Sequence, residues 1–238
     1  MKSYLSLLLS VYFILNSVCS LAAYELGGSI ALTSDYVYDG ESQSGESPAI
    51  QGSVDLGFDN GFYAGVWASS LDYEESYGVD GDVEIDLYIG YVKTINEWVS
   101  LDLGIYSFLY PGSDHDSLDY EELSFSTTIK DRVMLGITYN DDDTVWLGKQ
   151  IRYLASYTHP FPKEWSSTVK LIRTDNEPAL LKDDKLSWMI AVNKTFRDLD
   201  WELSYWDTDL SRSDTFADIA DPRVVLSASY SFGIINSN

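Results

Sequence analysis

The chain has 238 residues, with 38 acidic and 15 basic side chains and a formal net charge of −23 at pH 7. A surface this acidic repels nucleic acid and excludes a polyanion as the natural partner. Hydrophobic residues make up 45% of the sequence and aromatic residues 14%, which excludes a disordered chain. The one cysteine, Cys19, falls within the leader described next, so the rest of the sequence offers no disulfide, thiol nucleophile or thiolate metal site.

The first residues have the pattern of a secretory signal peptide. A positively charged start is followed by an apolar run, Leu5–Leu15, and by small residues up to Ala22 and Ala23. The apolar run is too short for a spanning helix. We therefore expect a signal peptide over residues 1–22, cut after Ala22 or Ala23, and one domain over residues 23–238.

Beyond the leader, segments of alternating apolar and polar residues recur, which is the pattern of half-buried strands. No later segment has the apolar run of a transmembrane helix. The sequence predicts twelve strands, at about residues 24–37, 48–59, 62–71, 82–92, 98–109, 119–129, 132–140, 148–158, 164–174, 185–196, 199–208 and 223–232.

The links between these strands alternate in length. Short links fall at residues 59–61, 93–97, 130–131, 160–163 and 197–198, and longer links rich in Asp and Glu fall between them. The pair Asn60-Gly61 is typical of a two-residue type I′ turn, because both residues tolerate positive φ. This alternation predicts an all-β, antiparallel up-and-down barrel with short turns at one end and long connections at the other.

Whether the apolar strand faces point outward to lipid or inward to a core decides between a membrane barrel and a soluble one. In "DVEIDLYIGY", residues 82–91, one face carries Val83, Ile85, Leu87 and Ile89, and the other carries Glu84 and Asp86. Aromatic residues near the strand ends are typical of the girdles of a membrane barrel: Tyr36, Tyr38, Phe58, Tyr91, Tyr120, Tyr139, Tyr157, Trp165, Trp188, Phe196 and Trp201. We therefore predict a transmembrane β-barrel with its apolar faces toward lipid. The alternative is a secreted soluble β-sandwich or lipocalin-like barrel with the faces exchanged.

The faces of residues 62–70 stay open at this stage. A two-residue turn at Asn60-Gly61 places Tyr63 and Trp67 outward, together with Phe58. The more apolar set, however, is Phe62, Ala64, Val66 and Ala68. The turn chemistry and the apolar pattern favour opposite assignments.

The polar faces predict the residues that line the interior. The acidic candidates are Asp55, Glu84, Asp86, Asp102 and Glu202, and the basic candidates are Arg132, Arg152 and Lys170. In a ring of twelve strands these acids and bases fall on roughly opposing walls, where they either set a field across a water-filled channel or pair and plug it. Strands about 4.8 Å apart and tilted by about 40° give a backbone diameter of roughly 24 Å, which leaves about 10 Å for a lumen.

Three stretches resemble the TorF-like family of proteobacterial outer-membrane porins: "SDYVYDGESQSGESPAIQGSVDLGFDNGFYAGVWASS" from Ser34, "EIDLYIGY" from Glu84 and "DPRVVLSASYSF" from Asp221. The resemblance implies an outer-membrane barrel more strongly than it implies a substrate. It implies mouth residues at Asp39, Gly40, Ser42, Gln43, Pro48 and Gln51. Where the family usually carries an Arg before the Gly of the first block, this sequence has Asp39, which strand parity places on the lumen side near the outer mouth.

The sequence gives little support for an enzyme. Its two histidines, His115 and His159, fall at opposite ends of the predicted barrel and cannot act together. The acidic runs at residues 80–86 and 141–143 lack the full spacing of a calcium loop, so we interpret them as solvated acids. We expect no cofactor and no metal.

Together these patterns predict a channel in the outer membrane of a Gram-negative cell, exported through the signal peptide. It would pass small solutes or ions by passive diffusion, with a preference for cations. Its partners would be outer-membrane lipid and the solutes. The alternative is a barrel that does not conduct and whose acidic loops meet a partner at the cell surface.

Overall fold

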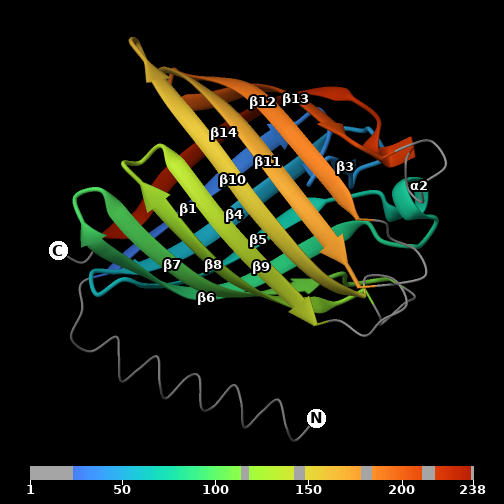
Figure 1. Ribbon diagram of the computed structural model, residues 1–238, viewed down its shortest axis with the longest axis horizontal. Helices are drawn as coiled ribbons and strands as arrows, with labels where there is room; N and C mark the ends of the chain where they lie inside the picture. Colours follow the sequence, from blue (N-terminus) through green and yellow to red (C-terminus); the bar gives the residue numbers. More distant parts are fainter. Residues whose placement is uncertain (1–23, 114–117, 142–147, 178–183, 211–217, 237–238) are drawn as a thin grey trace, which may run out of the picture.

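The computed structural model describes residues 24–113, 118–141, 148–177, 184–210 and 218–236, which form a closed antiparallel barrel of twelve strands (Figure 1). The strands are β1 (Tyr24–Thr33), β4 (Ala49–Phe58), β5 (Phe62–Ser70), β6 (Val83–Asn96), β7 (Val99–Leu109), β8 (Tyr120–Ile129), β9 (Val133–Asp141), β10 (Lys149–Phe161), β11 (Trp165–Asn176), β12 (Lys185–Phe196), β13 (Leu199–Thr208) and β14 (Arg223–Asn236). The predicted barrel and its strand number are confirmed. The predicted signal peptide, residues 1–22, lies outside the described residues.

Closure of the ring satisfies the backbone. Consecutive strands pair with each other, and β1 pairs with both β4 and β14. Ile30, for example, lies opposite Gly52 on one side and Tyr230 on the other. A closed ring leaves no strand edge with unpaired amides and carbonyls, which is the condition for a sheet to exist in hydrocarbon. Within the described ranges, no helix is long and apolar enough to cross a membrane.

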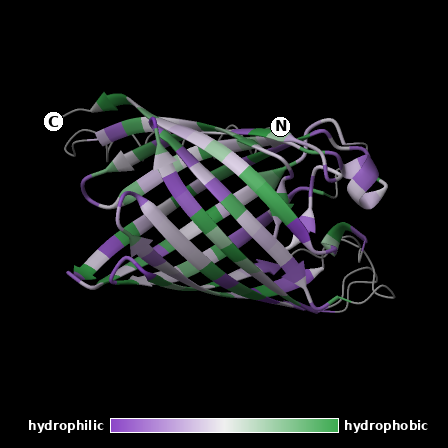
Figure 2. Ribbon diagram, turned by 90° about the horizontal axis from the view of Figure 1, so that it is seen from above, coloured by the Kyte–Doolittle hydropathy of each residue, from purple (hydrophilic) through white to green (hydrophobic). Residues whose placement is uncertain are grey.

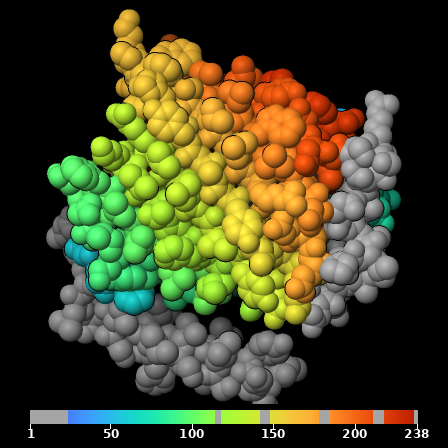
Figure 3. Space-filling view, in the orientation of Figure 1, coloured from blue at the N-terminus to red at the C-terminus, as the bar shows by residue number. Residues whose placement is uncertain are grey.

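The apolar strand faces point outward, as predicted. Leu87 and Ile89 are 44% and 49% exposed, whereas Glu84 is 3% exposed and faces the interior. The same alternation of apolar and polar residues runs along the neighbouring strands (Figure 2), and β7 to β12 form a continuous outer wall (Figure 3). A soluble barrel would have to bury these apolar side chains, so the soluble alternative is wrong and the outer wall is a lipid-facing surface.

The connection after β4 settles the faces of β5. Gly61 has φ of 96° and its amide donates to the Phe58 carbonyl at 2.8 Å, so the connection spans Asp59–Gly61. A type I turn followed by a residue with positive φ makes a three-residue hairpin loop. The expected two-residue type I′ turn is therefore wrong, and the apolar set led by Phe62 and Val66 faces lipid.

Two further expectations need correction. The link at residues 93–97 is mostly strand, because β6 continues to Asn96. Three of the predicted girdle aromatics lie inside the barrel: Tyr36 is buried, Tyr38 contacts Arg152, and Tyr120 stacks on Phe108 with ring centroids 4.4 Å apart. Tyr139, Tyr157, Trp165, Phe196 and Trp201 are exposed on the outer wall as predicted.

The adjacent residues Val54 and Ser53 test the two faces of β4. Val54 is 49% exposed on the outer wall, and Ser53 lines the interior beside Asp55. Val54→Arg should destabilise the barrel by about 2–4 kcal/mol, because it places a charge in hydrocarbon. Ser53→Arg, the matched control, should cost much less. Urea unfolding of lipid-reconstituted protein, followed by tryptophan fluorescence, measures both, and equal losses would show that the faces are misassigned.

Candidate functional site

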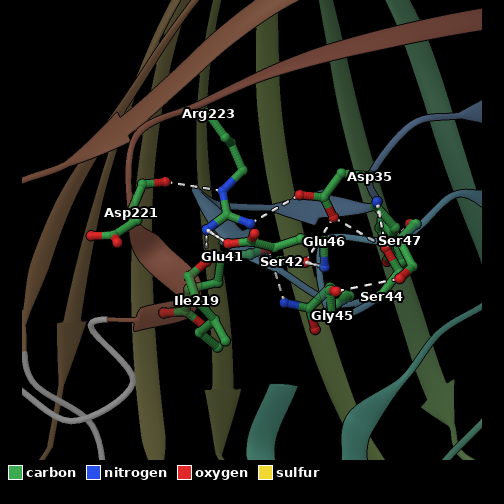
Figure 4. Close-up of polar contacts among 12 residues, drawn as sticks. Asp35, Glu41, Ser42, Ser44, Gly45, Glu46, Ser47, Ile219, Asp221 and Arg223 are labelled. Atoms are coloured by element: carbon green, nitrogen blue, oxygen red, sulfur yellow. Dashed lines mark hydrogen bonds and ion pairs between the residues drawn. The ribbon is translucent and has the colours of Figure 1, made fainter. Parts of the chain in front are cut away.

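The first long connection, residues 34–48, folds back into the barrel. It contains two short paired strands, β2 (Val37–Tyr38) and β3 (Glu41–Ser42). The chain reverses between them at Asp39 and Gly40, whose φ angles are 49° and 87°. Figure 4 shows this segment surrounded by the strands of the wall. We refer to residues 34–48 as the plug segment.

Four ion pairs join the plug segment to three basic side chains on one wall of the barrel. Arg223 on β14 contacts Asp35 at 2.9 Å and Glu46 at 3.5 Å. Arg152 on β10 contacts Asp39 at 2.7 Å, and Lys185 on β12 pairs with Glu41. The basic side chains are only 12%, 9% and 7% exposed for Arg152, Arg223 and Lys185. Buried bases require paired carboxylates. The plug segment supplies one each to Arg152 and Lys185 and two to Arg223.

Hydrogen bonds within the plug segment fix its shape. The Asp35 carboxylate accepts hydrogen bonds from the hydroxyls of Ser42, at 2.7 Å, and Ser44, at 3.0 Å. The Ser42 hydroxyl in turn accepts from the Glu46 amide at 2.9 Å (Figure 4). Arg223 donates to the same Asp35 carboxylate. One side chain therefore both fixes the shape of the segment and attaches it to β14.

A short helix, α2 (Tyr73–Tyr77), holds the plug segment from the second long connection. Tyr73 donates to the Gln43 side chain at 3.1 Å, and Gln43 donates to the Tyr77 hydroxyl at 2.8 Å. Tyr77 donates to Glu41 at 3.0 Å. Burial first, and then the charge of Glu41, raise the pKa of Tyr77 well above its usual value, so this hydroxyl remains a donor.

Apolar and aromatic side chains close the rest of this end of the lumen. They form a cluster of Tyr36, Ala49, Leu71, Tyr73, Val79, Phe108, Tyr110 and Leu118. Tyr36 meets Trp67 edge to face at 5.5 Å, and Tyr38 meets Phe108 at 6.4 Å. The plug segment is therefore held by charge on one wall and by aromatic packing on the other.

The opposite, short-turn end of the lumen is more open. A cavity of about 540 Å³ lies there, lined by Glu25, Gly27, Gly28, Ser29, Ser53, Asp55, Gly57, Ser231, Phe232 and Gly233. Asp55 accepts from Ser53 at 2.7 Å and from the Tyr88 hydroxyl. Asp102 accepts from the Tyr63 hydroxyl at 2.8 Å. Two of the predicted lining acids thus lie on the wall formed by β4 to β7.

Glu84 and Asp86 lie higher on the same wall, below the plug segment. Glu84 accepts from the Tyr110 hydroxyl at 3.4 Å. Glu84 Oε2 and Asp86 Oδ1 are buried without a hydrogen-bond partner among the described residues. Neither carboxylate has a basic partner in the ion pairs of the described chain.

The remaining lining candidates differ in their surroundings. Glu202 on β13 is half-buried opposite Asn193. Lys170 on β11 lies over the Trp206 ring, with its Nζ 5.4 Å from the ring centroid. Arg152 pairs with Glu122 as well as Asp39. Arg132 is an exposed residue of the turn before β9, so its assignment to that strand is wrong.

The predicted mouth residues mostly belong to the plug segment. Asp39, Gly40, Ser42 and Gln43 lie inside it, and Pro48 is exposed at its end. Gln51 lies on β4, and its side chain donates to the Ser69 hydroxyl at 3.4 Å. Sequence reasoning missed Asp35, Glu41, Glu46, Lys185 and Arg223, the members of the other three ion pairs. Lys185 and Arg223 are each the first residue of a strand that follows an acidic connection. A base at such a position was the sequence signal that could have predicted its pairing with an acid.

The histidines and acidic runs show no arrangement for chemistry in the described residues. His159 is exposed on β10, with Nδ1 3.1 Å from the Tyr157 hydroxyl, and His115 lies outside the described residues. Asp141 pairs with Lys149 at 3.1 Å, while the rest of its acidic run, residues 142–143, is also not described. Across the described ranges, no group of three or more His, Cys, Asp or Glu side chains is placed to hold a metal ion.

These features define a transmembrane β-barrel whose long-connection end is filled by its own plug segment. Residues 19–232 match the family described as "Bacterial protein of unknown function (Gcw_chp)", and the chain belongs to this family. No curated protein matches the chain.

Solved porin structures share the fold. The KdgM porin is 8% identical with a TM-score of 0.53, covering 88% of this chain and 99% of that one. A KdgM porin in complex with disordered oligogalacturonate is 9% identical with a TM-score of 0.53, covering 87% and 98%. The NanC porin is 9% identical with a TM-score of 0.53, covering 90% and 100%. The chain is thus porin-like in fold, and neither the family match nor these structures carry the TorF-like name.

The buried pair of Lys185 and Glu41 tests how the plug segment is held. Lys185→Met leaves the Glu41 carboxylate buried without its base, and should cost about 3–5 kcal/mol of unfolding free energy. Lys185→Met combined with Glu41→Leu should recover most of that loss, because it removes both charges. Chemical unfolding of the reconstituted variants gives both values. A double variant as unstable as the single one would contradict the pairing.

Proposed function

We propose that this protein is a porin-like channel of the Gram-negative outer membrane, which passes small solutes or ions by passive diffusion and prefers cations. The observation that carries the proposal is the inner lumen, with its cavity of about 540 Å³ and two carboxylates, Glu25 and Asp55, in its lining. The shared fold of KdgM and NanC, both named as porins, supports a channel. No catalytic step is part of the proposal.

The cation preference follows from which charges remain free. Arg152, Lys185 and Arg223 are matched by acids of the plug segment. Asp55 and Asp102 accept hydrogen bonds from tyrosine hydroxyls, and neither they nor Glu202 form an ion pair within the described chain. Among the predicted bases, Lys170 lies over the Trp206 ring instead of pairing with an acid there. An excess of fixed negative charge raises the local cation concentration in a narrow lumen.

The orientation is part of the same proposal. Export through the leader at residues 1–22 would deliver the chain to the outer membrane as a member of a TorF-like porin group. The short turns, the start of β1 and the end of β14 would then face the periplasm, and the long acidic connections would face the cell exterior. The plug segment would restrict the outer mouth.

A second candidate function is a barrel that does not conduct and serves as a surface-interaction protein. The observation that favours it is the packing of the plug segment, whose residues Glu41, Ser42, Gln43 and Ser44 are all buried. In that case the acidic connections at the outer end would be the functional surface.

Planar-bilayer recordings under a KCl gradient test the channel and its selectivity together. The wild-type protein should give a reversal potential of cation-selective sign. Asp102→Asn combined with Glu202→Gln should reduce that potential, because it removes fixed lumen charge without changing side-chain size. Asp198→Asn, in the exposed turn between β12 and β13, is the control and should leave it unchanged.

An anion-selective wild-type potential would refute the charge argument. Absence of conductance from folded protein, verified by a boiling-dependent gel shift, would refute the channel and favour the surface-interaction barrel.

A further inference from the structure

Three tyrosines form a row on the inner wall beside the open cavity. Tyr63 on β5, Tyr88 on β6 and Tyr106 on β7 are neighbours, with ring centroids 6.4 Å apart for Tyr63 and Tyr88 and 5.7 Å apart for Tyr88 and Tyr106. In the strand register, Tyr88 lies directly opposite Tyr106. All three are half-buried. At one end of the row, Tyr106 packs against the aromatic cluster under the plug segment.

Glycines on the same wall allow the rings to lie against it. A Cβ atom at Gly65 would come within 2.4 Å of the Tyr88 hydroxyl oxygen, and one at Gly90 within 2.3 Å of Tyr63 Cζ. Any other residue at these positions would push the rings away from the backbone. Each ring therefore covers a bare stretch of sheet, and its uncovered side is directed to the lumen.

Carboxylates fix two of the three tyrosines, Tyr63 and Tyr88, in this position. Tyr63 donates to Asp102 at 2.8 Å, and Tyr88 donates to Asp55. A carboxylate has about four lone-pair sites, so each acid keeps acceptor capacity after binding its tyrosine. The row thus presents aromatic surface and hydrogen-bond acceptors side by side.

The row adjoins a space of suitable size. Asp55 belongs both to the tyrosine row and to the lining of the cavity of about 540 Å³. That volume lies within the range of about 300–1,000 Å³ typical of small-molecule sites. Glu25 is the second acid of the lining, and the lining contains no lysine or arginine among the described residues. The site combines aromatic faces with negative charge.

We propose that the row of Tyr63, Tyr88 and Tyr106, with Asp55 and Asp102, is a binding site for an amino sugar, a pyranose ring that carries an ammonium group. The apolar face of the sugar ring packs on the tyrosine faces, and its hydroxyls donate to the carboxylates. The ammonium group pairs with Asp55 or Asp102 and is attracted by the aromatic rings. This inference names a solute class for the proposed channel and so rests on that function.

Calorimetry on the full-length protein, folded in detergent micelles, tests the site. The probe is the β-1,4-linked disaccharide of glucosamine, and cellobiose is the matched sugar without charge. We expect the glucosamine disaccharide to bind at least about tenfold more tightly than cellobiose. We expect Tyr88→Leu to weaken its binding about tenfold. Tyr153→Leu, on the lipid-facing side of β10, is the control and should bind as the wild type does.

Tyr88→Phe and Asp55→Asn separate the ring from the charge. Tyr88→Phe keeps the aromatic face and should retain most of the affinity, whereas Asp55→Asn should weaken binding of the glucosamine disaccharide and leave cellobiose unaffected. Equal binding of both sugars, no binding, or equal affinity of wild type and Tyr88→Leu would overturn the proposal. Calorimetry does not depend on ion flow. A protein that binds the sugar but does not conduct would refute the channel alone, and one that conducts but does not bind the sugar would refute the binding site alone.

Discussion

The structure depends on one constraint, which is that every backbone amide and carbonyl in hydrocarbon must find a partner within the protein. Closing twelve strands into a ring meets this constraint. Once the ring is closed, the strict alternation of side chains divides the sequence into a lipid-facing half and a lumen-facing half. Leu87 and Asp86 are neighbours in the chain, yet one contacts lipid and the other lies in the interior. The lumen therefore receives the charged residues that the hydrocarbon excludes.

The charges of the lumen are distributed between two walls, and the plug segment changes their balance. Bases on β10, β12 and β14 meet the acids of the plug segment, while the wall from β4 to β7 keeps Asp55, Glu84, Asp86 and Asp102. Desolvating these ions is costly, so the attachment contributes position more than stability. The segment leaves the inner lumen acidic because it neutralises the bases of the opposite wall. Of the two sequence-based alternatives, paired charges describe the attachment of the plug segment, and a field across the lumen stays a prediction.

The barrel could be predicted from the sequence because a period of two is a local property that survives in every strand. The faces of β5 could not, because they depend on whether the turn before Phe62 has two or three residues, and Asn-Gly suits both. The plug segment has no period at all. Its inward fold depends on partners more than a hundred positions away, as Arg152 is from Asp39. Aromatic residues gave a misleading signal for Tyr36, Tyr38 and Tyr120, since a lumen rich in tyrosine resembles a girdle in sequence.

The attachment of the plug segment coincides with the seam of the barrel. Ser34 exchanges hydrogen bonds with Leu226, the Thr33 and Ser227 hydroxyls bond across 194 positions of sequence, and Asp35 binds Arg223 on the same strand. The first and last strands therefore meet where the plug segment begins. Because this contact joins the two ends of the chain, its loop-closure entropy is the largest in the ring. The seam and the attachment of the plug segment therefore depend on each other, because parting β1 from β14 would also separate Asp35 from Arg223 and detach the segment from that strand.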